Sequence, residues 1–126
     1  MPDKAILIVD DDESICNLLS TFLQRQGHEV RMERDGRKAI ELYQQNRPHV
    51  TILDIEMPDM DGLAVLRELR TIDPTAAVIM LTGAGTEARA REARELRVTD
   101  FLAKGFSIHE LGTVLKRVLV SIGPRE

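Results

Sequence analysis

Short aliphatic runs alternate along this chain with longer segments in which apolar side chains recur every three or four positions. The runs cover residues 5–9, 50–53, 77–81 and 99–103, and a weaker alternation around Val30 and Met32 covers residues 28–33. Runs of this length that are apolar throughout favour strands whose two faces are both covered. The pattern therefore predicts five strands.

The intervening segments have the spacing of amphipathic helices. Predicted helices run from about Glu13 to Gly27, from Asp35-Gly36 to before Pro48, over residues 62–72 and 86–96, and from Ser107 to about residue 120. Asp12 and Ser107 are the expected N-caps of the first and last helix, and Gly27 is a suitable C-terminal cap. Residues 121–126 are expected to fray.

The helix expected over residues 86–96 differs from the others. Its apolar residues are Ala88, Ala90, Ala93 and Leu96. A helix with so few apolar side chains buries little surface and depends on charge pairs such as Glu87 with Arg91. We expect it to be the loosest helix of the fold.

Five strands that alternate with five helices through short loops predict an α/β fold, a doubly wound parallel sheet with helices on both faces. The 126 residues, 43% of them hydrophobic and 30% charged, suffice for one domain with a proper core. No linker or repeat is visible. We therefore expect a single domain over residues 1–126, with its core in about 4–121 and without an output domain.

Charge and composition exclude several classes of protein. A net charge of −4 with no Trp, one Tyr and three Phe argues against direct nucleic-acid binding. The first apolar run is too short for a signal peptide or a membrane span, so we expect a cytoplasmic protein without a membrane partner. The single Cys16 cannot form an internal disulfide and is interpreted as a small residue of the first helix.

Polar side chains follow most of the predicted strands directly. They are Asp10, Asp11 and Asp12 after the first strand, Asp54 after the third, Thr82 after the fourth and Lys104 after the fifth. The carboxyl ends of parallel strands meet at one edge of the sheet, where ligands bind, so these side chains should converge. Clustered carboxylates repel one another unless a cation lies among them. An all-oxygen site of this kind suits Mg²⁺, or Mn²⁺, better than Zn²⁺.

Most of these residues also have an ordinary structural interpretation, but Asp10 and Asp11 do not, which favours a metal-binding role for that pair. Asp54 could simply begin a turn, and Asp12 and Glu13 could complement the dipole of the first helix. Lys104 is either a solvated loop residue or a counterion in the acidic crevice.

Thr82 precedes Gly83, which permits close backbone approach, so the hydroxyl and nearby N–H groups could bind an anion. A carboxylate nucleophile, a divalent metal, a cation and a hydroxyl are the parts needed to accept a phosphoryl group as an acyl phosphate.

Four motifs together resemble the receiver domain of two-component response regulators. They are Ile-Leu-Ile-Val-Asp10-Asp11-Asp12, Leu-Asp54-Ile-Glu-Met-Pro58-Asp-Met-Asp-Gly62, Leu-Thr82-Gly and Phe-Leu-Ala-Lys104, in the order and spacing of that family. The resemblance extends from about Lys4 to Val120 and implies the flavodoxin-like strand order 2-1-3-4-5. It also implies that a sensor histidine kinase or a histidine phosphotransfer protein phosphorylates Asp54.

The same resemblance implies roles for the other site residues. Asp11 would bind Mg²⁺ directly, Asp10 through water, and Glu56 through its backbone carbonyl. Thr82, Gly83 and Lys104 would contact the phosphoryl oxygens. Phe101 matches an aromatic switch residue whose inward or outward rotamer depends on the position of Thr82. The face formed by the helix over 86–96, the strand over 99–103 and the last helix would report this rotamer change to a downstream protein. Ordinary core packing of Phe101 is the alternative.

Three departures from the family pattern stand out. Gly105 replaces the usual proline after Lys104, and because a cis bond without proline costs about 3–4 kcal/mol, we expect a trans bond with some displacement of Lys104. Arg97-Val98 replaces a common Gly-Ala pair, which predicts an unusual end for the helix over 86–96. Glu56 and Ala84 occupy the variable positions that in the family tune the lifetime of the phosphoryl group.

Three functions compete. The first is a phosphoacceptor receiver, monomeric or weakly dimeric, that catalyses only its own aspartyl phosphorylation and dephosphorylation and acts by protein contact. The second is a receiver-like binding module that works without phosphorylation, which Gly105 makes worth testing. The third, an Asp-nucleophile phosphohydrolase, is disfavoured because Asp54-Ile-Glu56 lacks the second aspartate of the usual Asp-x-Asp pair.

Overall fold

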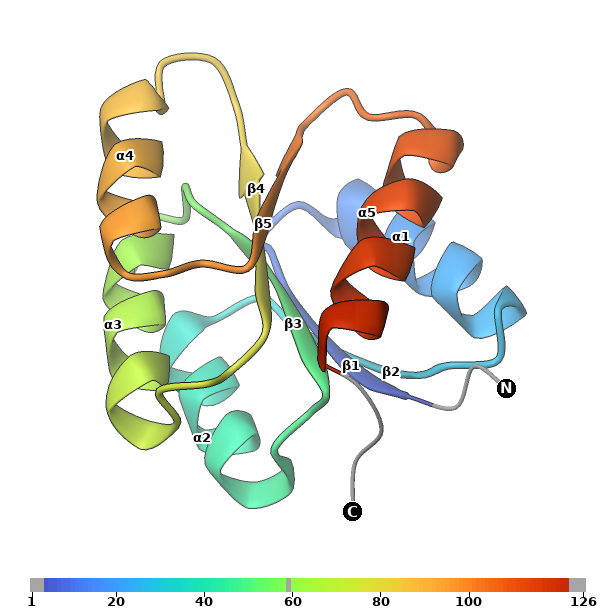
Figure 1. Ribbon diagram of the computed structural model, residues 1–126, viewed down its shortest axis with the longest axis horizontal. Coiled ribbons are helices and arrows are strands. Elements are labelled where there is room, and N and C mark those ends of the chain that lie inside the picture. The colour runs from blue at the N-terminus through green and yellow to red at the C-terminus, as the bar shows by residue number, and fades with distance from the viewer. Residues whose placement is uncertain (1–3, 59, 123–126) are drawn as a thin grey trace.

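A computed structural model describes residues 4–58 and 60–122 as a parallel sheet flanked by helices (Figure 1). The strands are β1 (Ala5–Val9), β2 (Glu29–Glu33), β3 (Val50–Asp54), β4 (Val78–Thr82) and β5 (Asp100–Ala103). The helices are α1 (Glu13–Arg25), α2 (Gly36–Asn46), α3 (Gly62–Ile72), α4 (Glu87–Glu95) and α5 (Ile108–Ile122). All pairings are parallel and the order is β2-β1-β3-β4-β5, which confirms the predicted doubly wound fold.

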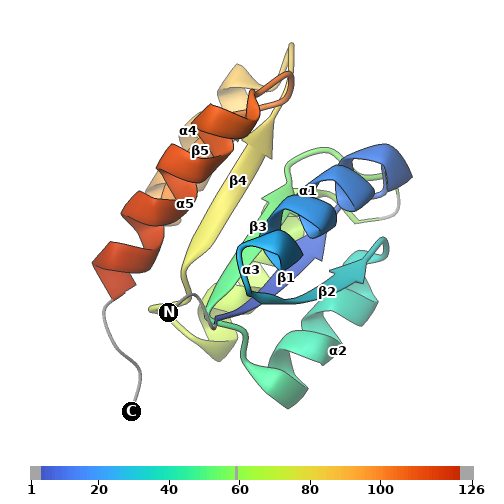
Figure 2. The ribbon, with the colours of Figure 1, turned by 90° about the vertical axis from the view of Figure 1, so that its right-hand side faces the viewer.

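The sheet separates two apolar layers. Helices α1 and α5 lie on one face and α2, α3 and α4 on the other (Figures 1 and 2). Successive residues of a strand point to opposite faces, so Ile6 and Ile8 pack under α1 and α5, while Leu7 and Val9 pack toward α2 and α3. Within the described residues no helix is long and apolar enough to cross a membrane.

Most helices begin at a side-chain cap. Asp12, Asp35 and Asp61 each accept hydrogen bonds from two backbone N–H groups at the start of α1, α2 and α3. At α5, Ser107 Oγ accepts from the Glu110 N–H while the Glu110 carboxylate accepts from the Ser107 N–H, a reciprocal capping box. The predicted caps Asp12 and Ser107 are therefore confirmed. At α4, Thr86 makes no side-chain hydrogen bond to the helix start.

A few boundaries differ from the predictions by one or two residues. Strand β4 is shifted by one position, to Val78–Thr82, because Thr82 still pairs with Ala103 of β5 and its carbonyl accepts from the Lys104 N–H at 2.7 Å. The expected fraying from residue 121 was wrong for Ser121 and Ile122, which continue α5. Residues 123–126 of that prediction lie outside the described residues.

The loop after β5 and the end of α4 both have left-handed backbone. No described peptide bond is cis, so the trans Lys104–Gly105 bond is confirmed, and Gly105 has φ 94°. Arg97 has φ 58°, a conformation that costs a residue with a side chain about 1–2 kcal/mol. Arg70 of α3 offsets this strain, because its guanidinium donates to the carbonyls of Leu96, Arg97 and Ala76, each at 2.8 Å. The unusual end of α4 is confirmed.

Candidate functional site

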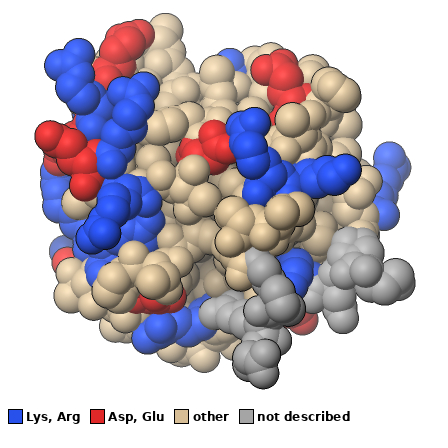
Figure 3. All heavy atoms as spheres, viewed as in Figure 1, with Lys and Arg blue, Asp and Glu red and all other residues tan. Residues whose placement is uncertain are grey.

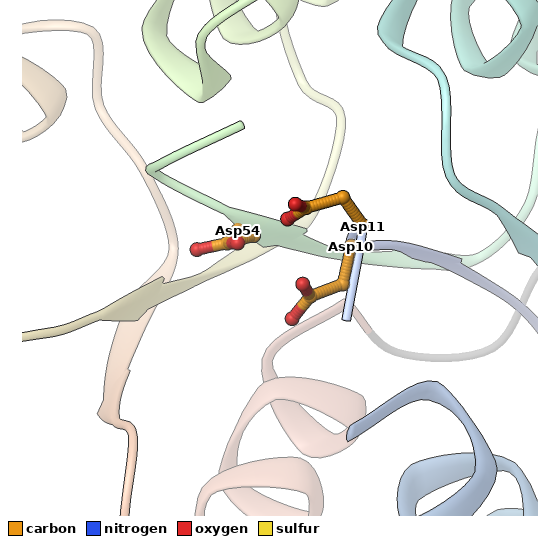
Figure 4. Close-up of side chains that lie close together, drawn as sticks. All are labelled: Asp10, Asp11 and Asp54. Carbon is orange, nitrogen blue, oxygen red and sulfur yellow. The ribbon is translucent and has the colours of Figure 1, made fainter. Parts of the chain in front are cut away.

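Three carboxylates meet at the carboxyl edge of the sheet. Asp54 is the last residue of β3, and Asp10 and Asp11 directly follow β1 (Figure 4). Asp10 and Asp54 are 0% and 1% exposed, whereas Asp11 is exposed. One oxygen from each of the three lies within 4.8 Å of the others. The convergence that strand order alone predicted is therefore present in the fold.

Backbone hydrogen bonds fix the orientation of the two buried carboxylates. The Asp12 N–H donates to Asp10 Oδ1 at 3.0 Å, and the Glu56 N–H donates to Asp54 Oδ1 at 3.1 Å. Both donors come from the loop immediately after the strand. Each bond occupies one oxygen of its carboxylate and leaves the second, Oδ2, turned toward Lys104.

Lys104 supplies the cation of the site. Its Nζ lies 3.0 Å from Asp54 Oδ2 and 3.6 Å from Asp10 Oδ2. Burial lowers the pKa of Lys104, but the hydrogen bond and charge of Asp54 and the charge of Asp10 outweigh it, so the pKa is raised. The lysine is therefore firmly protonated at neutral pH. Whatever displacement Gly105 causes, it does not keep the ammonium from Asp54.

Asp10 is short of positive partners. Burial, together with the neighbouring charge of Asp54, raises the pKa of Asp10 to about 7, although the Asp12 N–H and Lys104 oppose the rise. Its Oδ2 is buried and makes no hydrogen bond to the described residues. A hard divalent cation among these oxygens would favour the ionised form of Asp10 and would give its Oδ2 a partner. The preferred ligands of such a cation are carboxylates and carbonyls. The donor set therefore fits Mg²⁺.

Thr82 and Gly83 lie at the end of β4, beside the carboxylates in the sheet. The Gly83 N–H, expected to contact a phosphoryl group, donates here to Thr86 Oγ1 at 3.2 Å, and that hydroxyl donates to the Gly83 carbonyl at 2.6 Å. Contact of the Gly83 N–H with a phosphoryl group would require its hydrogen bond to Thr86 to break. The sequence analysis missed Thr86, which it took only as the start of a helix. A Thr three residues after a loop Gly was the available signal, because Thr hydroxyls readily bond nearby backbone.

Gly62 brings the loop between β3 and α3 close to the acceptor strand. A Cβ at this position would lie 2.2 Å from the Asp54 carbonyl oxygen and 2.7 Å from Ile55 Cα. Both are backbone atoms, so no other residue fits without moving β3. From the sequence, Gly62 was expected at the start of a helix and at the end of the motif that contains Asp54, without a role in packing against β3. Its role in letting the loop close over Asp54 became visible in three dimensions.

Two of the expected site residues contact arginines of α4. The side chain of Glu56 turns outward and pairs with Arg89, 3.1 Å from Nη2 to Oε2. Phe101 is half-buried at the margin of the layer beneath α4, with Arg94 over its ring at 5.2 Å from the centroid. Neither arginine was singled out from the sequence. The metal-binding role of the Glu56 carbonyl and the switch role of Phe101 stay predictions.

Comparison with known proteins identifies the family of this chain. The family profile described as response regulator receiver domain matches residues 6–116. The chain belongs to the receiver-domain family of response regulators. It is 36% identical to regulatory protein AtoC of Escherichia coli over 90% of its own length, and 32% identical to sporulation initiation phosphotransferase F of Bacillus subtilis over 94%. It superposes on the structure of Vibrio cholerae chemotaxis protein CheY4 with a TM-score of 0.85 and 33% identity, covering 91% of this chain.

The relatives of this receiver domain differ in length. The chain spans 25% of AtoC, but 96% of the Bacillus phosphotransferase and 98% of the CheY4 chain. Receiver domains thus occur both as part of larger regulators and as nearly the whole of small proteins. Membership of the family places the chain in two-component signalling, while the identity of its partners is a matter for proposal.

Proposed function

We propose that this receiver accepts a phosphoryl group on Asp54 and passes the signal on by protein contact. The observation that carries the proposal is the placement of the Asp54 carboxylate, 3.0 Å from Lys104 Nζ and within 4.8 Å of oxygens of Asp10 and Asp11. A buried carboxylate with a paired cation and a carboxylate cluster beside it is equipped to act as a nucleophile toward a phosphoryl group.

The transfer forms one bond and breaks one. An Asp54 oxygen attacks phosphorus, the bond from phosphorus to the donor breaks, and the electron pair leaves with the donor, a phosphohistidine imidazole or a small carboxylate. Lys104 would move from the Asp54 carboxylate to a phosphoryl oxygen, and Thr82 would donate its hydroxyl to another. Asp10, Asp11 and the Glu56 carbonyl would hold Mg²⁺, which when bound stabilises the charge that develops on the phosphoryl oxygens.

The partners follow from this chemistry. The donor would be a sensor histidine kinase or a histidine phosphotransfer protein, and the chain itself would catalyse nothing beyond its own phosphorylation and dephosphorylation. Movement of Thr82 toward the phosphoryl group would be passed to Phe101 and to the surface formed by α4, β5 and α5. Support for that surface comes from Arg94, which links α4 to Phe101 of β5 directly.

The test is the intact mass of the protein after incubation with acetyl phosphate and Mg²⁺. We expect one added phosphoryl group, absent from Asp54→Asn and absent when the metal is chelated. A mass gain that persists in Asp54→Asn would move the acceptor to another residue. Absence of any gain, both with acetyl phosphate and with phosphorylated histidine donors, would overturn the proposal in favour of a binding module that works without phosphorylation.

A further inference from the structure

Arg89, in the first turn of α4, contacts both ends of the loop that follows the acceptor. Its Nη2 lies 3.1 Å from Glu56 Oε2 and its Nη1 lies 3.7 Å from Asp61 Oδ2. Glu56 is two residues beyond Asp54, and Asp61 is the N-cap of α3. One guanidinium therefore joins α4 to the entrance and the exit of the β3–α3 loop.

The Glu56 carboxylate lies at the rim of the site. Its backbone N–H is fixed on Asp54 Oδ1, while its side chain is 57% exposed and its Oε1 is 3.9 Å from where a Cβ on Gly83 would be. It thus reaches from the loop after β3 toward the loop after β4. Together with Met57, Pro58 and Arg89 it lines an open cavity of about 390 Å³.

The balance of charge here is unfavourable to an anion. The described residues place five carboxylates in the site and at its rim, those of Asp10, Asp11, Asp54, Glu56 and Asp61. Two described cations contact them, Lys104 from the loop after β5 and Arg89 from α4. Lys104 is engaged inside the site, so Arg89 is the cation that compensates the rim. Phosphodonors carry negative charge, and fixed charge at the mouth of a site alters their rate of approach.

We propose that Arg89 is a positioning residue for phosphorylation of this receiver. It holds the Glu56 and Asp61 carboxylates at the rim and compensates their charge, so that an anionic phosphodonor can approach Asp54. Without Arg89, the Glu56 side chain would be released beside Gly83 and would repel the donor. The inference rests on the proposed function of Asp54 as acceptor and adds a residue of α4 to the determinants of its reactivity.

The first test compares initial rates of phosphorylation by acetyl phosphate with saturating Mg²⁺ at low ionic strength. We expect Arg89→Gln to be slowed about tenfold, the lower end of electrostatic effects on approach. Arg91→Gln is the matched control, since Arg91 is an exposed residue of the same helix with the same charge. It should slow the reaction much less, because among the described residues no ion pair links Arg91 to a carboxylate of the site or its rim.

Two further variants separate charge from structure. Glu56→Gln removes the carboxylate that Arg89 holds, so combining it with Arg89→Gln should restore most of the lost rate. Arg89→Lys keeps the charge but cannot span two carboxylates and should be intermediate. Raising the salt concentration should shrink the gap between Arg89→Gln and the parent because ions screen the rim. A merely structural role in α4 would show neither the rescue nor the salt dependence.

The outcomes distinguish this inference from the proposed function. If the parent protein gains no phosphoryl group, or gains it equally as Asp54→Asn, both are overturned. If the parent is phosphorylated on Asp54 but Arg89→Gln and Arg91→Gln react at the same rate, the role of Arg89 is refuted and the acceptor chemistry stands. A slow Arg89→Gln that Glu56→Gln fails to rescue would refute it equally.

Discussion

The two helices that flank β5 are held in place by different forces. Helix α5 buries four apolar side chains, Leu111, Val114, Leu115 and Val118, and begins with a reciprocal capping box. Helix α4 buries Ala90 and Ala93 and has no side-chain cap. Burial of a large aliphatic side chain contributes about 1.5–3 kcal/mol, whereas an alanine offers little surface to bury.

Arginines make polar contacts that stabilise α4, which buries little apolar surface. Arg67 of α3 pairs with Glu92 of α4, and Arg70 binds carbonyls at the end of α4. From α4 itself, Arg89 pairs with Glu56 and Arg94 lies over the Phe101 ring. Basic and acidic side chains intermingle over α3 and α4, at the left in Figure 3. Such contacts are directional and sensitive to charge. We therefore expect a change of charge at the site to affect the position of α4 more than that of α5. Its looseness stays a prediction.

The largest effect is expected from the core of α5. Leu115→Ala should lower the free energy of unfolding by about 2–5 kcal/mol, because Leu115 is buried in the layer shared with α1. Ala93→Gly, at an equally buried position of α4, should cost only about 1 kcal/mol through helix propensity. Urea denaturation measures both, and equal losses would contradict the difference between the two helices.

Arg70→Met tests the contacts that hold the end of α4. The loss of two hydrogen bonds from a charged donor to the Leu96 and Arg97 carbonyls at the end of α4 should lower the free energy of opening of α4 by about 2–3 kcal/mol. Hydrogen exchange of the α4 amides reports this opening, and the α5 amides should change much less. Arg67→Met is the control, since its exposed ion pair with Glu92 is worth at most about 1 kcal/mol. Unchanged α4 exchange in Arg70→Met would show that the helix does not depend on these bonds.

Ser107→Ala tests the cap that α5 has and α4 lacks. Loss of the bond from the Glu110 N–H should cost about 1 kcal/mol and increase exchange in the first turn of α5. Thr113→Ala, which removes a hydroxyl from the same helix but no cap, should have a smaller effect. The two variants would lower the melting temperature equally only if the capping box contributed nothing.

The smallest expected effect is a gain in stability. Arg97→Gly removes left-handed strain at the end of α4 and should raise stability by about 0.5 kcal/mol, since glycine adopts positive φ freely but loses more chain entropy. Arg91→Gly, in the interior of α4, should instead cost about 1 kcal/mol. Opposite shifts in melting temperature are the expected result, and a loss at position 97 would mean that the Arg97 side chain has a role of its own.

Much of the fold could be predicted because the signals are local and regular. Aliphatic runs mark the strands, and Asp12 and Ser107 precede helical patterns with side chains that favour the N-cap position. Strand order then brings Asp54 and Lys104 together although 50 residues separate them. This convergence can be predicted from the topology alone, without side-chain geometry, because all parallel strands end at one edge of the sheet.

What escaped prediction depends on atoms rather than patterns. The close approach of Gly62 to the Asp54 carbonyl depends on the exact path of the backbone, and many glycines at helix starts have no such role. Arg70 and Arg89 reach their partners through long flexible side chains, and nothing in the sequence distinguishes them from the other arginines of the chain. The hydroxyl of Thr86 could have capped α4 or bonded to Gly83, and only the local backbone decides between them.

The alternation of strand residues between two layers has a consequence for protein engineering. Ile8 belongs to the layer under α1 and α5, while its neighbour Val9 belongs to the layer under α2 and α3. Substitutions in opposite layers usually have additive effects on stability where the sites lie more than about 7–10 Å apart and share no partners. Stabilising changes found separately in the two halves could therefore be combined by simple arithmetic, with the acidic edge of the sheet left untouched.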